Sequence, residues 1–168
     1  MTKNLLTSAV LAGVAAGLIA ALLQLTFVIP HLMEGELYET GERIHFATDG
    51  STQSDRIQPS IGTDFARHGM TLAFNMITYT GYGLILLALM VFANSKGHVI
   101  TPRNGLIWGI AGFIAVQLAP GIGQPPVLPG AIGSEVGPRQ AWWAMTIIVT
   151  AIALALIAFG KGWTALLS

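Results

Sequence analysis

Histidine and acidic side chains flank one polar segment of the chain and are of the types that hold a divalent metal ion. Three acids follow His31 closely, and His68 stands at the far end of the same segment. Imidazole with carboxylate suits cobalt or nickel, whereas imidazole with thioether sulfur suits Cu(I). The residues of this predicted metal site are His31, Glu34, Glu36, Glu39 and His68. The alternative, that these residues only mark a membrane boundary, stays open.

Four carboxamide side chains form a second polar group within otherwise apolar sequence. They are Gln24, Asn75, Gln117 and Gln140. Counted along the helices expected below, each lies near the same outer third of a membrane span. Polar side chains in lipid normally face a bundle interior or a water-filled cavity. They predict either hydrogen bonds between helices, worth about 0.6 kcal/mol each, or a vestibule that receives a hydrophilic solute.

The composition places these residues in a membrane protein. The chain is 53% hydrophobic and 10% charged, whereas soluble domains carry about 25% charged residues. Cysteine is absent, which excludes disulfides, thiolate metal sites and iron–sulfur clusters. There is no basic patch for nucleic acid. The sequence also lacks a phosphate-binding loop, a nucleophile elbow and an HExxH motif, so we expect no enzyme.

The hydrophobic pattern predicts an all-α integral membrane protein, a four-span helical bundle in a single domain covering residues 1–168. The expected spans are residues 5–29, 69–93, 105–118 and 141–159. An acidic outer loop, residues 30–68, joins the first two spans, and a Pro/Gly-rich segment, residues 119–138, joins the last two. Gly13 and Gly17 form a small-xxx-small pair that lets another helix approach closely.

The third span is expected to be short and broken. Residues 105–118 would rise only about 21 Å as a helix, less than the roughly 30 Å hydrocarbon core. The helical pattern then breaks at Ala119-Pro120, where a run rich in proline and glycine begins. Such a break points to a transport site and to a candidate re-entrant segment. The alternative is an ordinary helix followed by a stiff surface loop.

The charges predict how the four spans are oriented. With four spans, all eight carboxylates fall on one side and all three lysines on the other, together with both termini. Positively charged residues concentrate in the short segments of the lysine side. Because cytoplasmic loops carry an excess of lysine and arginine, we expect both termini in the cytoplasm.

Several short motifs together resemble one known family. They include Gly105-Leu106-Ile107-Trp108-Gly109, Leu118-Ala119-Pro120 and Arg139-Gln140-Ala141-Trp142-Trp143. The single residues that carry the likeness most clearly are Pro30, Tyr38, Trp108, Pro120, Pro126, Pro129, Arg139, Trp142 and Trp143. This pattern resembles the CbtA-type family of predicted cobalt transporter subunits, and the likeness covers most of the chain.

The resemblance implies a bacterial inner-membrane protein that serves cobalt supply for cobalamin synthesis, beside a small single-span partner of the CbtB type. Two departures qualify this expectation. Family members often have a histidine-rich stretch where this chain has only His45, which weakens metal capture by this subunit alone. Many also continue into a Pro-His-x-x-Gly-Ala-Pro element, whereas this sequence ends at Ser168. That ending is consistent with a shortened relative or with a neighbour that supplies the span.

Two functions therefore remain open from the sequence. The first is a membrane subunit of a cobalt, or related divalent metal, uptake system. The second is a structural subunit of a larger membrane complex that has no transport activity of its own. In both cases the surrounding lipid bilayer and other membrane subunits are the expected partners.

Overall fold

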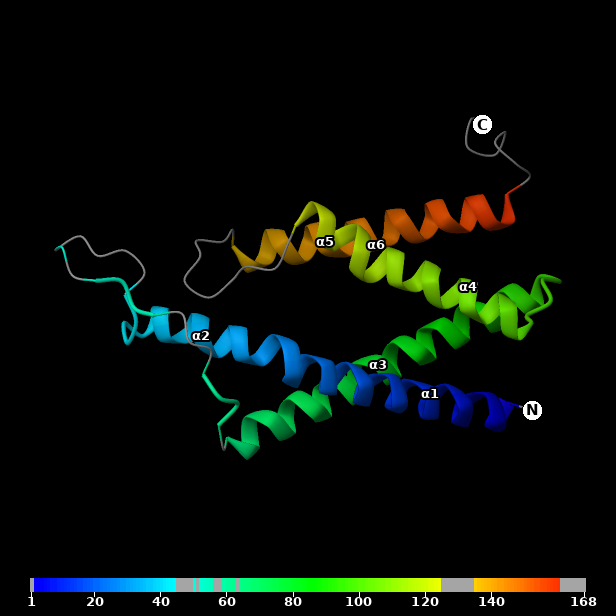
Figure 1. The fold of residues 1–168 in the computed structure, drawn as a ribbon. Helices are drawn as coiled ribbons and strands as arrows, with labels where there is room; N and C mark the ends of the chain where they lie inside the picture. The colour runs from blue at the N-terminus through cyan, green and yellow to red at the C-terminus, as the bar shows by residue number, and fades with distance from the viewer. Residues whose placement is uncertain are drawn as a thin grey trace. The chain divides into compact units, whose positions relative to one another are not determined.

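Helices make up all the regular structure that can be described. The computed structural model describes residues 2–44, 50, 52–55, 59–62, 64–124 and 135–160. Along the chain the elements are α1 (Thr2–Leu23), η1 (Gln24–Val28), α2 (Ile29–Glu39), α3 (Phe65–Ser95), α4 (Pro102–Phe113), η2 (Ile114–Leu118), α5 (Ala119–Gly123) and α6 (Val136–Phe159) (Figure 1). These ranges contain no strand, and the all-α prediction is confirmed.

Four continuous helical stretches are long and apolar enough to cross a membrane. They are Lys3–Glu39, Phe65–Ser95, Pro102–Gly123 and Val136–Phe159. The shortest has 22 residues and rises about 33 Å. Each stretch therefore exceeds the roughly 30 Å thickness of the hydrocarbon core.

Most apolar side chains on these helices face outward. Among the described residues, the buried hydrophobic ones are Ala21, Ile29, Ala93 and Ala115. Larger side chains such as Phe74 and Ile77 are 66% and 68% exposed. Continuous apolar surface of this kind is unusual for a soluble monomer, but lipid tails solvate it well. The four-span membrane prediction is confirmed.

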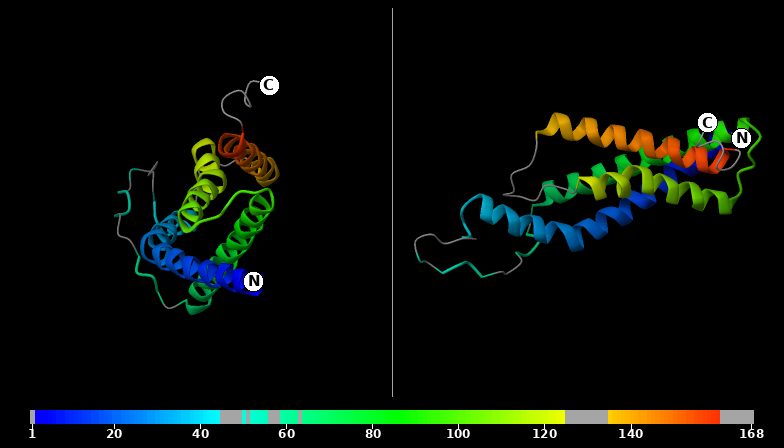
Figure 2. Two further views of the ribbon diagram at one scale, coloured as in Figure 1. Left: turned by 90° about the vertical axis from the view of Figure 1, so that its right-hand side faces the viewer. Right: turned by 90° about the horizontal axis from the view of Figure 1, so that it is seen from above.

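The chain falls into two units, the first ending at Leu89 and the second starting at Met90. Unit 1 contains α1, η1, α2 and most of α3. Unit 2 contains the end of α3 together with α4, η2, α5 and α6. Each unit pairs a helix interrupted by a π segment with an uninterrupted helix. Figure 2 shows α1 crossing α3 and α4 beside α6.

The helices of unit 1 cross in backbone contact at two glycines. A Cβ atom added to Gly13 would lie 2.5 Å from the Cα of Thr80, and one added to Gly17 would lie 2.6 Å from the Cα of Met76. Neither position has room for a side chain. The close approach predicted from Gly13 and Gly17 is therefore observed, and α3 is the helix that makes it.

A π segment precedes a proline in the interrupted helix of each unit. η1 ends two residues before Pro30, and η2 ends two residues before Pro120. Proline has no N–H, and its ring clashes with the carbonyl four residues earlier. A π turn places one extra residue in the helix and lets the chain pass this obstacle. Both helices then continue beyond their proline.

This continuation corrects the expected boundary of the third span. The sequence predicted that the helix ends near Leu118, but it runs through η2 and α5 to Gly123. The interruption at Ala119-Pro120 is a π segment and not the end of the helix, because that segment accommodates the proline. Residues 125–134, which include Pro126 and Pro129, lie outside the described residues, so the re-entrant segment stays a prediction.

Aromatic side chains provide the close contacts of unit 2. The indole ring of Trp142 on α6 lies against Gly123, the last residue of α5. Near the other end of α6, the Phe159 ring is 5.9 Å from that of Trp108 and 4.6 Å from that of His98, between centroids. Both α4 and α5 contact α6. Unit 2 is therefore a helical hairpin with aromatic contacts near both ends.

Candidate functional site

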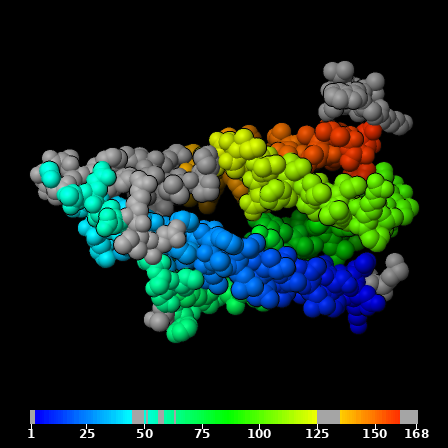
Figure 3. Space-filling view, in the orientation of Figure 1, coloured from blue at the N-terminus to red at the C-terminus, as the bar shows by residue number. Residues whose placement is uncertain are grey.

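An ion pair joins α2 to the start of α3 at one end of unit 1. Both guanidinium nitrogens of Arg67 donate to the carboxylate of Glu36, Nη1 to Oε2 at 2.8 Å and Nη2 to Oε1 at 2.6 Å. This two-point geometry is the strongest arrangement for arginine and a carboxylate. In Figure 3 the end of α2 and the first turns of α3 lie side by side at this end of unit 1.

A second ion pair joins α2 to the residues that follow it. The Nη1 atom of Arg43 is 3.2 Å from Oε1 of Glu34, and both side chains are more than four-fifths buried. Arg43 stands just after the end of α2, where its N–H donates to the carbonyl of Leu37. We call Glu34, Glu36, Arg43 and Arg67 the rim cluster. Within this cluster, Glu34 and Glu36, which the sequence predicted as metal ligands, each form an ion pair with an arginine.

His68 is held by a different contact. Its Nε2 atom lies 3.0 Å from the carbonyl oxygen of Ile61, so Nε2 carries a proton and donates. Its Nδ1 atom is buried without a hydrogen-bond partner. The neighbouring Asp64 accepts the backbone N–H of Arg67 at 3.0 Å and so caps α3. His68 is thereby fixed at the rim with one ring nitrogen turned inward.

The predicted metal ligands are not gathered into one site. Within the described part of the chain, no group of three or more histidine and acidic residues could hold a metal ion. This set includes His31, Glu34, Glu36, Glu39 and His68. Glu34 and Glu36 already accept hydrogen bonds from arginines, so a metal ion there would compete with two guanidinium groups. The metal site stays a prediction.

Sequence reasoning missed the role of Arg43 and Arg67, which it had counted only among the charges that orient the chain. Arg67 follows Asp64 by three residues, a spacing typical of the first turn of a capped helix, and that signal could have placed Arg67 at a helix start. Its partner Glu36 is 31 residues away in sequence, with a loop between them. No local pattern links two residues at that distance.

The carboxamides behave differently in the two units. In unit 1, Nδ2 of Asn75 donates to Oε1 of Gln24 at 2.8 Å and to the carbonyl of Thr71 at 2.9 Å. This is the hydrogen bond between helices that the sequence offered as one interpretation. In unit 2, Gln117 and Gln140 are exposed. A vestibule that includes all four carboxamides stays a prediction.

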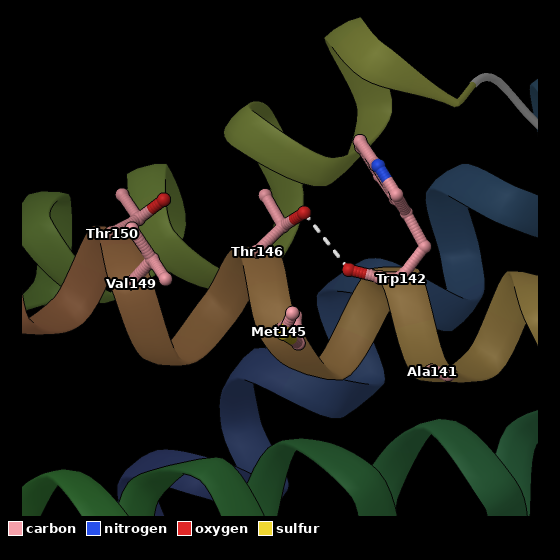
Figure 4. Close-up of a pocket in the computed structure, with 6 residues that line it drawn as sticks. All are labelled: Ala141, Trp142, Met145, Thr146, Val149 and Thr150. Atoms are coloured by element: carbon pink, nitrogen blue, oxygen red, sulfur yellow. Dashed lines mark hydrogen bonds between the residues drawn. The ribbon is translucent and has the colours of Figure 1, made fainter.

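Unit 2 also has an apolar hollow of about 510 Å³ on one face of α6. Its lining residues are Ala141, Trp142, Met145, Thr146, Val149 and Thr150. Figure 4 shows Trp142, Thr146 and Thr150 pointing toward the side where α4 and α5 lie. The Thr146 hydroxyl donates to the carbonyl of Trp142 at 2.9 Å, so it turns back onto its own helix. The hollow therefore offers apolar surface.

One known protein family matches nearly the whole chain. The family described as "Probable cobalt transporter subunit (CbtA)" matches residues 2–167. The chain belongs to the CbtA family. No curated protein and no solved structure matches it. The family is described as a probable cobalt transporter subunit, and the four candidate spans agree with a membrane protein.

Four of the residues that suggested the CbtA family lie at the π segments or at the aromatic contacts of unit 2. Pro30 and Pro120 follow the two π segments. Trp108 and Trp142 make the aromatic contacts of unit 2. The remaining described motif residues are Tyr38 on α2 and Arg139 and Trp143 on α6. His45, like Pro126 and Pro129, lies outside the described residues.

Proposed function

We propose that the chain is a subunit of a cobalt, or related divalent metal, uptake system in a bacterial inner membrane. The rim cluster faces outward and both termini lie in the cytoplasm. In the CbtA context, the metal would supply cobalamin synthesis, and a small single-span CbtB-type chain would be one partner. This role requires no catalytic group of its own.

The observation that carries this proposal is the separation of charge along unit 1. Residues 4–33 and 68–95 contain no lysine, arginine, aspartate or glutamate. The segment between them, residues 30–68, has seven carboxylates and three arginines, a surplus of four negative charges. Such a surface raises the local concentration of cations. The segment as a whole, whose carboxylates outnumber its arginines, then concentrates cations at the mouth of the span and need not chelate them.

The test is cobalt accumulation in cells that express single variants. We expect Glu36→Gln to lower accumulation, because it removes a rim carboxylate, and the triple replacement of His31, Glu34 and Glu36 to lower it further. Thr52→Ala is the control, since Thr52 is exposed in the same loop and its replacement leaves the charge unchanged. Unchanged accumulation in the triple variant would contradict the proposal.

Arg67→Gln separates attraction of cations from support of the fold. If Glu36 acts by attracting cations, removal of the competing guanidinium leaves accumulation unchanged or raises it. If Glu36 serves only to hold Arg67 in place, the two variants lose activity together. Immunoblots of the membrane fraction correct for the amount of each protein.

One observation favours a second function, that of a structural subunit in a larger complex. Glu34 and Glu36 are both neutralised by arginines, an arrangement that fixes helices as readily as it guides ions. Native purification in mild detergent distinguishes the two functions. Stable co-purification with other membrane chains, without bound metal and with no effect on cobalt accumulation, would favour the structural role.

A further inference from the structure

The turn that joins α3 to α4 carries positive charge and no negative charge. Lys96 and Arg103 stand at its two ends, and both side chains are exposed. The nearest carboxylates along the chain are Asp64 and Glu135, each separated from the turn by a membrane-spanning helix. We call residues 96–103 the basic turn. It holds a surplus of positive charge that no neighbouring residue in the sequence offsets.

The basic turn lies at the boundary of the membrane. α3 ends at Ser95 and α4 begins at Pro102 (Figure 1), and both belong to stretches long and apolar enough to cross a bilayer. Residues 68–95 and 104–124 contain no lysine, arginine, aspartate or glutamate. Long basic side chains at the ends of such spans extend to the level of the lipid headgroups. The anions that surround the turn at this level are therefore phospholipid phosphates.

Hydrogen bonds within the turn fix its backbone. Gly97 has a φ of +93°, and the N–H of His98 donates to the carbonyl of Ala93 at 3.2 Å. A left-handed glycine with this bond satisfies the last carbonyls of a helix, here α3. On the other side, the Thr101 hydroxyl accepts the N–H of Asn104 at 3.3 Å and so caps α4. Because the chain closes both helix ends itself, the turn presents its side chains from a defined backbone.

Aromatic rings support the basic side chains of the turn. The Nζ atom of Lys96 is 5.5 Å from the centre of the Phe92 ring, a distance typical of a cation–π contact. The His98 ring lies against Phe159, which in turn lies against Trp108. Aromatic rings are enriched where a membrane meets water. The lysine stem thus lies along an apolar ring, which leaves its ammonium group at the headgroup level.

The positive charges of the basic turn differ from those of the rim cluster in having no carboxylate beside them. Both arginines of the rim cluster form ion pairs with glutamates. Within the part of the chain that the structure describes, neither Lys96 nor Arg103 forms an ion pair. Their N–H groups are therefore available to an anion from outside the chain.

We propose that the basic turn binds the phosphate of an anionic phospholipid. Arg103 supplies a planar fork of N–H donors that matches two phosphate oxygens, and Lys96 adds a compact second charge. Basic residues clustered beside a transmembrane helix favour lipids whose headgroup carries net negative charge. In phosphatidylcholine the ammonium group of the headgroup offsets the phosphate, so phosphatidylglycerol is the better ligand. This role goes beyond metal uptake, and it belongs to the opposite end of α3 from Arg67.

The first test measures how tightly the full chain binds each lipid, by native mass spectrometry from mild detergent. We expect phosphatidylglycerol to bind about 20-fold more tightly than phosphatidylcholine, because two basic side chains act together. Arg103→Gln and Lys96→Gln should each weaken phosphatidylglycerol binding about fivefold and leave phosphatidylcholine binding unchanged. Equal affinity of the unchanged protein for the two lipids would overturn the inference.

Two further variants separate the basic turn from overall charge and from support of the fold. Arg67→Gln is the matched control, because it removes a guanidinium that Glu36 already engages, and it should leave the preference for phosphatidylglycerol unchanged. Arg103→Lys keeps the charge and should retain more binding than Arg103→Gln. A loss in Arg67→Gln as large as in Arg103→Gln would show that overall charge selects the lipid, and would overturn the inference. Equal losses in Arg103→Lys and Arg103→Gln would also overturn it, since the charge would then play no part.

Inorganic phosphate distinguishes a lipid site from a site for free anions. Sodium phosphate and sodium chloride are compared at equal ionic strength, so that both screen the charges alike. We expect the two salts to weaken phosphatidylglycerol binding equally, because the acyl chains of the lipid add apolar contact that a free anion lacks. Displacement of the lipid by phosphate alone, in the unchanged protein but not in Arg103→Gln, would identify a site for free phosphate and overturn the lipid assignment.

Discussion

Unit 1 and unit 2 are both helical hairpins whose first helix contains a π segment, yet different contacts support them. In unit 1, α3 touches the backbone of α1 at Gly13 and Gly17 and is bridged to the interrupted helix by Asn75 and Arg67. In unit 2, aromatic rings fill the corresponding role, and Gln117 and Gln140 are exposed. The comparison shows that a helix containing a π segment can be supported either by polar contacts with its neighbour or by aromatic packing.

The largest expected effect comes from the glycine crossing of unit 1. Gly17→Ala would place a Cβ 2.6 Å from a backbone atom of Met76, so one helix must move away. We expect a loss of about 2 kcal/mol in the free energy of unfolding, measured by thermal unfolding in detergent. Gly81→Ala in α3 is the control, because nothing lies within 4 Å of its added Cβ. Equal stability of the two variants would contradict the close crossing.

The matching glycine of unit 2 should be more tolerant. In Gly123→Ala the added Cβ meets the indole of Trp142, and a side chain can turn aside where a backbone cannot. We expect a loss of about 1 kcal/mol and a shift in tryptophan emission that disappears in a Trp142→Phe background. Gly121→Ala, whose Cβ would meet nothing within 4 Å, should leave both stability and emission unchanged.

A smaller difference is expected between the carboxamides of the two units. A double-mutant cycle of Gln24→Leu and Asn75→Leu should give a coupling of about 0.6 kcal/mol, the average for hydrogen bonds between membrane helices. The same cycle with Gln117→Leu and Gln140→Leu should give additive effects, because the structure shows no bond between them. Coupling in unit 2 as strong as in unit 1 would remove this contrast.

The ion pair of the rim cluster should contribute least to stability. The side chains of Arg67 and Glu36 are 33% and 43% exposed, and pairs at such positions are worth about 0.5 kcal/mol. Arg67→Gln should therefore lower the unfolding temperature slightly at low salt, and the difference should shrink at high salt as charges are screened. A large effect that does not depend on salt would mean that Arg67 is held by more than Glu36.

Part of the site could be predicted from residue types and part could not. Gly13 and Gly17 predicted a close crossing, because a small-xxx-small pair lets the backbone of another helix approach on that face. That Gln24 and Asn75 lie at the same level followed from counting along two spans. The pairing of Glu36 with Arg67 did not follow, since the loop between them can bring many different residues together. The rule that proline ends a helix was wrong at Pro120, where a π segment takes up the extra length.

By itself, the sequence determined that this is a four-span helical membrane protein, because runs of uncharged apolar residues longer than the hydrocarbon core have few other stable forms. It also determined that the charged residues lie in the segments between and beyond the spans. Only the tertiary structure decided which carboxylates pair with arginines and which helix crosses the glycines. These depend on distances between segments far apart in the chain, and a hydrogen bond or an ion pair forms only when such distances are correct to within a fraction of an ångström.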